Sequence, residues 1–122
     1  MAPNDIKQDF ESAMTRHFLF KTKLRSFLYG NGYDEGPLRD PDQCSLGQWI
    51  AKRRAGAYAD VPGMAALDDA HRRIHREASV LMDHHLAGRA DAAAAGLPAV
   101  LDQAEAIVVL LQTIEGKLRT GA

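Results

Sequence analysis

The chain has 122 residues, of which 46% are hydrophobic and 25% are charged, and this composition is typical of one folded domain, residues 1–122. Fifteen basic and 16 acidic residues give a net charge of -1, which argues against a protein that mainly binds nucleic acid or an anionic membrane. The single cysteine excludes an intramolecular disulfide and favours a reducing, cytoplasmic setting. No uninterrupted run of 18 apolar residues occurs, so we expect no membrane-spanning segment.

The first predicted element is a long helix that covers residues 6–27. Its apolar positions recur at alternating intervals of four and three, which places them in one stripe along a helix. Gly30 and Gly32 end this helix, and a loop rich in glycine, aspartate and proline runs to about Asp40. The stripe consists of Ile6, Phe10, Ala13, His17, Phe20, Leu24 and Phe27.

A second, shorter helix is predicted from Pro41 to about Arg54. Asp40 is suited to cap it, Pro41 fits the first helical position, and Gln43 stands where a capping box places its polar residue. This interpretation puts Cys44, the only cysteine, in the first turn of the helix. The positive end of the helix dipole would there favour a thiolate.

Two further long helices are predicted over residues 64–85 and 93–118, with Gly88 between them. Both repeat the alternating three- and four-residue spacing, although Pro98 should kink the last helix or mark its restart. No segment has the pattern of a strand. The simplest way to bury these stripes is an all-α fold, an antiparallel four-helix bundle with one shorter helix that carries the cysteine.

Polar residues interrupt the stripes at informative positions. His17 and His71 both occupy stripe positions, and His75 follows His71 by four residues, the spacing at which two imidazoles share one helix face. Together with Cys44 they form a set of three histidines and one thiolate, which suits a four-coordinate Zn²⁺. Each signal alone is common in structural roles, such as a hydrogen-bonded core histidine or a small buried cysteine. Their convergence favours a metal, because unsatisfied polar groups in a core cost about 1–3 kcal/mol each.

Other metals fit this donor set less well. Ca²⁺ and Mg²⁺ prefer oxygen ligands, and a di-iron site needs several glutamates with paired Glu-x-x-His motifs. Copper or nickel could compete with zinc in vitro. His85 lies 14 residues from His71, about 21 Å along a helix, so neither it nor His84 is expected to bind the same ion.

Three segments, residues 16–24, 44–50 and 71–75, resemble the chemoreceptor zinc-binding domain family. The shared pattern is an early helical histidine, a Cys-x-Leu/Phe-Gly-x-Trp motif and a later His-x-x-x-His, and the block from Cys44 to Trp49 is its most specific part. The resemblance implies a helical bundle and zinc ligands at His17, Cys44, His71 and His75. Phe20 stands where the family often has tryptophan.

The resemblance also implies a sensory role, because members are usually attached to bacterial chemoreceptors or diguanylate cyclases and sense zinc or oxidants. These 122 residues hold no output domain, so the signalling partner is expected to be a separate protein if the chain is complete. We therefore expect a zinc-binding regulatory module in chemotaxis or cyclic-di-GMP control and not an enzyme, since four protein ligands leave no open position for water.

Alternative functions remain open at this point. The chain could be a helical dimerisation or interaction domain with a purely structural metal or none, or a metal-dependent hydrolase in which water replaces one ligand. A homodimer is expected from the wide apolar arcs of the first and last helices, which include Phe18, Leu19 and Val109. Cys44 is the candidate redox switch, because an oxidised sulfur is a poor zinc ligand.

Overall fold

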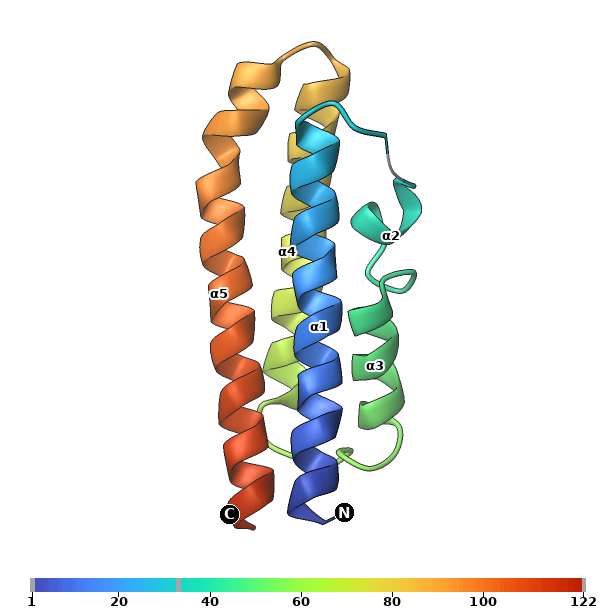
Figure 1. Cartoon of the computed structure of the whole chain (residues 1–122), viewed down its shortest axis with the longest axis vertical. Coiled ribbons are helices and arrows are strands. Elements are labelled where there is room, and N and C mark those ends of the chain that lie inside the picture. The colour runs from blue at the N-terminus through green and yellow to red at the C-terminus, as the bar shows by residue number, and fades with distance from the viewer. Residues whose placement is uncertain (1, 33, 122) are drawn as a thin grey trace.

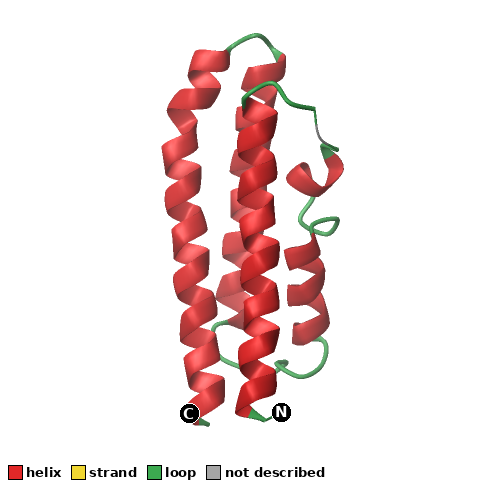
Figure 2. Cartoon of the chain, viewed as in Figure 1, coloured by secondary structure: helices red, strands yellow, loops and turns green. Residues whose placement is uncertain are grey.

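The computed structural model describes residues 2–32 and 34–121, and it shows that the all-helical prediction is confirmed. Within these residues there are five helices and no strand (Figures 1 and 2). The four predicted helices are all present, but a short additional helix lies in the segment that we predicted as a loop. The helices are α1 (Pro3–Leu28), α2 (Gly36–Arg39), α3 (Ser45–Arg54), α4 (Met64–Leu86) and α5 (Ala90–Thr120).

The three long helices, α1, α4 and α5, lie side by side, and α2 and α3 follow one another along the remaining side (Figure 1). The chain direction alternates: α1 and α4 run one way, whereas α3 and α5 run the other. The most extensive packing joins α5 to α4 and α1, and both α2 and α3 pack against α4 and α1. The segment that holds Cys44 therefore faces two long helices at once.

The predicted stripes form the hydrophobic core. Every predicted stripe residue of α1 is buried, including His17, which is 2% exposed. In α4 and α5 the predicted stripes are also buried, apart from His85, Leu97 and Leu118, which are partly exposed. The buried stripe residues are Met64, Leu67, His71, Ile74, Ala78 and Leu81 in α4, and Ala93, Val100, Ala104, Ile107, Leu111 and Ile114 in α5. The intervals of three and four residues were therefore sufficient to identify the inward side of each long helix.

The predicted helix over residues 41–54 is wrong in its first turn. Residues 41–43 form a turn, and α3 begins at Ser45 with Cys44 as its N-cap, in an extended conformation. The Asp40 carboxylate accepts hydrogen bonds from the Asp42 backbone N–H (2.9 Å) and the Gln43 side chain (3.2 Å). Asp40 thus closes a local turn instead of capping a helix, a competition that short polar side chains often win.

Helix α5 continues through Pro98, so the predicted alternative of a restart at this residue is wrong. Before it, Gly88 adopts a positive φ of 79°, which ends α4 as expected from the sequence.

By length and composition alone α5 could cross a membrane, although a core helix of a soluble protein meets the same criteria. In this structure its buried side packs against α1 and α4.

The C-terminal half of α3 is fastened to α1 by Asp9. Its carboxylate accepts hydrogen bonds from Trp49 Nε1 (3.1 Å), Arg53 Nε (2.8 Å) and the Tyr58 hydroxyl (2.6 Å), and it also pairs with the second guanidinium nitrogen of Arg53. Phe10 packs edge-on against Trp49. Burial raises the pKa of Asp9, whereas these hydrogen bonds and the Arg53 charge lower it. The lowering is the larger effect, so the pKa of Asp9 lies below its ordinary value.

Candidate metal centre

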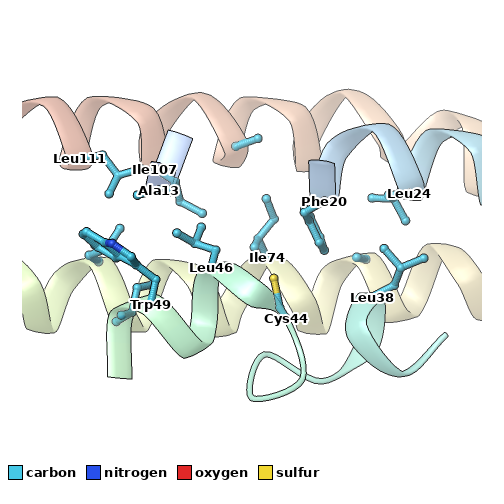
Figure 3. Packing of buried hydrophobic residues seen from close by; sticks show 14 of the residues in the cluster. Ala13, Phe20, Leu24, Leu38, Cys44, Leu46, Trp49, Ile74, Ile107 and Leu111 are labelled. Carbon is cyan, nitrogen blue, oxygen red and sulfur yellow. The ribbon is translucent and has the colours of Figure 1, made fainter. Parts of the chain in front are cut away.

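Three of the four predicted ligands lie together in the core. Cys44, His71 and His75 each present one donor atom, and these atoms lie within 4.8 Å of one another. All three side chains are buried, with exposed fractions of 4%, 2% and 0%. Cys44 comes from the N-cap of α3 and the two histidines from consecutive turns of α4, and Figure 3 shows the Cys44 sulfur pointing from the start of α3 into the interior.

Helix α2 orients His75. The Nδ1–H group of His75 donates a hydrogen bond to the Leu38 carbonyl oxygen at 2.8 Å, and this leaves a lone pair on Nε2. Phe20 of α1 packs against the same imidazole, with ring centroids 4.6 Å apart. A backbone carbonyl that accepts the distal N–H of an imidazole is the usual way in which proteins fix a histidine ligand.

His71 is the least satisfied of the three. Its Nε2 lies 3.0 Å from Nε2 of His75, and its Nδ1 is buried with no hydrogen-bond partner among the described residues. An orphaned nitrogen in a core is costly, so this imidazole has a donor atom available for a ligand.

Gly47 makes room for this imidazole. A Cβ atom built on Gly47 would fall well inside contact distance of the Pro41 carbonyl oxygen and 2.9 Å from Cε1 of His71. The sequence motif therefore needs glycine because the 41–43 turn and α4 both approach α3 here. The close approach at Gly47 thus involves the backbone of the turn as well as a side chain of α4.

His17 is buried beside the cluster but engaged elsewhere. Its Nε2–H donates a hydrogen bond to the Ala104 carbonyl oxygen of α5 at 2.9 Å, and its nitrogens are not in the group of atoms defined above. A positive charge on His17 would lower the pKa of His71 and of His75, so the three imidazoles interact electrostatically. His17 is thus a neighbour of the cluster whose Nδ1 remains available as a donor.

Burial keeps the three imidazoles neutral. Burial, together with the smaller effects of the nearby His75, His17 and Arg72, lowers the pKa of His71 to about 3. Burial also lowers the pKa of His17 and of His75, although their backbone hydrogen bonds act in the opposite direction. Neutral imidazole is the form that binds a metal, so these side chains need lose no proton to do so at neutral pH.

Burial has the opposite consequence for the thiol. It raises the pKa of Cys44, against the smaller lowering by the backbone N–H groups of Gly47 and Leu46 and by the charges of Lys23 and Arg16. The expectation that the helix dipole favours a thiolate is therefore wrong for the metal-free chain, in which desolvation is the larger effect. A divalent cation would supply the charge that stabilises the thiolate.

These observations together fit zinc. The donor set is one sulfur and two or three imidazole nitrogens, all buried, with one nitrogen unsatisfied and another already oriented by a carbonyl. Zinc prefers such sulfur and nitrogen ligands in a closed tetrahedral site. The site can therefore hold one ion, which would join α3 to α4.

The other two histidines lie away from this cluster, as predicted. His84 accepts a hydrogen bond from Arg89 Nε at 3.2 Å, and His85 packs against Phe27 with ring centroids 5.4 Å apart.

The sequence interpretation missed the carbonyl groups of Leu38 and Ala104, which accept hydrogen bonds from His75 and His17. Gly36-Pro37 could have predicted α2, since proline favours the first helical positions. No pattern of side chains predicts which backbone carbonyl group will accept a hydrogen bond from a histidine.

Comparison with known families agrees with this geometry. A family model described as "Chemoreceptor zinc-binding domain" matches residues 17–82, which is more than half of the chain. The matched segment contains Cys44, His71, His75 and His17, and all of α5 lies beyond it. No curated protein and no solved structure matches the chain.

Proposed function

The chain belongs to the chemoreceptor zinc-binding domain family, whose metal is zinc, and on this premise we propose that it is a regulatory module in bacterial signalling. The observation that carries the proposal is the buried group of Cys44, His71 and His75 with its unsatisfied nitrogen. Zinc binding there would couple the position of α2 and α3 to the metal, because Leu38 and Cys44 both contact the site. A signalling partner could read that position.

We propose His17 as the fourth ligand, through Nδ1. The Ala104 carbonyl holds its Nε2–H in the manner typical of metal-bound histidines. With His17 included, the ligands come from α1, the N-cap of α3 and α4, so one ion would join three elements. When bound, zinc would supply a fixed positive charge that holds the Cys44 sulfur as a thiolate.

Elemental analysis of protein purified without added metal is the direct test, with about one zinc per chain as the expected result. His17→Ala, Cys44→Ser, His71→Ala and His75→Ala should each weaken zinc binding strongly. His84→Ala is the matched control, since it removes an imidazole from α4 away from the cluster. If His17→Ala binds zinc as tightly as the parent chain, His17 is not a ligand.

Metal content also separates this function from its rivals. A helical dimerisation or interaction domain with no physiological metal would purify without zinc and keep its stability in a chelator. A hydrolase would require a vacant ligand position for water, and we propose instead that four protein ligands fill the site, which favours a non-enzymatic role.

We further propose that oxidation of Cys44 is a signal, in addition to zinc itself. Attack of the thiolate on peroxide would break the O–O bond, leave a sulfenic acid on sulfur and release hydroxide. The test is to add peroxide to zinc-loaded protein and follow zinc release with a colorimetric chelator. Zinc release should follow oxidation of Cys44, which mass spectrometry of the intact protein measures in the same samples. If zinc leaves before Cys44 is oxidised, or stays bound after it is oxidised, the zinc is structural only.

The remaining features of the proposal concern assembly. We propose that residues 1–122 form one domain, in which α2 and α3 together would take the fourth place of an antiparallel four-helix bundle; the packing of both helices against α1 and α4 supports this. A homodimer is supported by Phe18, Leu19 and Val109, which are 62%, 45% and 57% exposed. A monomer in sedimentation at tens of micromolar would contradict the homodimer.

We further propose that the protein acts in the cytoplasm, where its cysteine stays reduced, with a chemoreceptor or diguanylate cyclase as partner.

A further inference from the structure

A small cleft reaches Cys44 from the surface between α1 and the segment that contains α2. It has a volume of about 40 Å³, enough for a molecule of a few heavy atoms, and it is bounded by Phe20, Leu38 and Cys44 on its inner side. Figure 3 shows Phe20 and Leu38 lying on the same side of Cys44, with Leu46 and Trp49 on the other. Cys44 therefore lies at the inner end of this cleft, and it is 4% exposed.

Two cations line this cleft, and no carboxylate is among its described lining residues. Arg16 and Lys23 stand at its α1 side, and both charges act on the Cys44 sulfur. Arg16 donates hydrogen bonds to Ser12 Oγ (3.2 Å) and to the Ser45 carbonyl oxygen (3.4 Å), which keep its guanidinium at the cleft.

These two cations differ from most of the arginines of this protein. Six arginines pair with carboxylates, whereas neither Arg16 nor Lys23 forms an ion pair within the described part of the chain. Their positive charge at the cleft is therefore not compensated locally. Such a charge concentrates small anions at the opening and disfavours cations.

We propose that this cleft is an anion-selective entrance to Cys44, in which Arg16 and Lys23 determine which small molecules reach the sulfur. The ligand class is a small monovalent anion, held by the two cations with one end against the sulfur. Neutral molecules of the same size enter without this advantage. The inference concerns access to the thiol, and every variant is compared with the parent at the same zinc content, because bound zinc would add its own positive charge at the sulfur.

The test compares iodoacetate with iodoacetamide, which differ in charge and are closely similar in size. Cys44 is the only cysteine, so mass spectrometry of the intact protein gives the rate of each reaction directly. Both rates depend equally on the thiol pKa, and their ratio therefore isolates the effect of charge on entry. The ratio of iodoacetate to iodoacetamide should be higher in the folded chain than in urea, and it should fall as salt is added.

The variant that combines Arg16→Gln and Lys23→Gln should lower this ratio by about three- to tenfold. Lys7→Gln is the matched control, since it removes one exposed charge of α1 away from the cleft and should leave the ratio unchanged. If the double variant fails to fold, Lys23→Gln alone should lower the ratio by about two- to threefold. A ratio that is the same in the parent, the cleft variants and Lys7→Gln would overturn the proposal, whatever the zinc content of the protein.

Discussion

Gly47→Ala should disrupt the metal centre without removing a ligand. In an ordinary helix this change adds about 1 kcal/mol of stability. Here the new Cβ would overlap the Pro41 carbonyl oxygen and lie 2.9 Å from Cε1 of His71, where ordinary contacts begin at 3.4 Å. Because the Pro41 oxygen belongs to the backbone, it cannot rotate away, and the 41–43 turn must move. Overpacking of this kind costs about 1–3 kcal/mol, and displacement of a ligand's support weakens metal binding about 10- to 100-fold.

The assay is zinc affinity by competition with a chromophoric chelator, combined with thermal unfolding of the zinc-loaded and metal-free chains. Gly116→Ala is the matched control, because a Cβ there meets nothing within 4 Å and the glycine is also inside a helix. That control should raise stability by about 1 kcal/mol and leave zinc affinity unchanged. If Gly47→Ala keeps the parent's zinc affinity and melts no lower than the parent, the close approach of the turn and His71 does not control the site.

Three further predictions follow from the same structure. Removal of zinc should lower the melting temperature by about 10–20 °C, because a ligand at a thousandfold excess over Kd stabilises the folded state by about 4 kcal/mol; an unchanged calorimetric transition after complete chelation would refute this. Asp9→Asn should lower the free energy of unfolding at neutral pH by about 2–3 kcal/mol. The pKa of Asp9 in the folded chain is below its ordinary value of 3.8, so the ionised carboxylate stabilises the fold fully above pH 3.8 and this contribution is lost as the pH falls through the folded pKa. The free energies of unfolding of parent and variant, measured by urea titration, should therefore become equal in acid. Leu111→Ala, at a core position that is 1% exposed, should cost about 2–5 kcal/mol in urea unfolding while zinc affinity measured in native buffer stays the same.

Much of the fold and of the candidate site could be predicted from local sequence. The stripes identified the buried sides of the long helices because helix periodicity is a property of each segment on its own, independent of what packs against it. The same reasoning holds for His71 and His75, whose four-residue spacing sets them on one face before any tertiary contact forms. Spacing within one helix says nothing about a residue on another, so their place beside Cys44 needed two further arguments: that buried polar side chains would share one metal, and that the family motif contains all of them.

Tertiary structure decided the rest, and it did so through the backbone. Whether Asp40 capped a helix or closed a turn depended on competing hydrogen bonds of similar strength, and the outcome moved Cys44 from the first turn to the N-cap. Carbonyl groups are the same in every residue, so no sequence pattern could show that Leu38 and Ala104 accept hydrogen bonds from His75 and His17. The thiol pKa was likewise set by desolvation, which exists only once α1, α3 and α4 have closed around the sulfur.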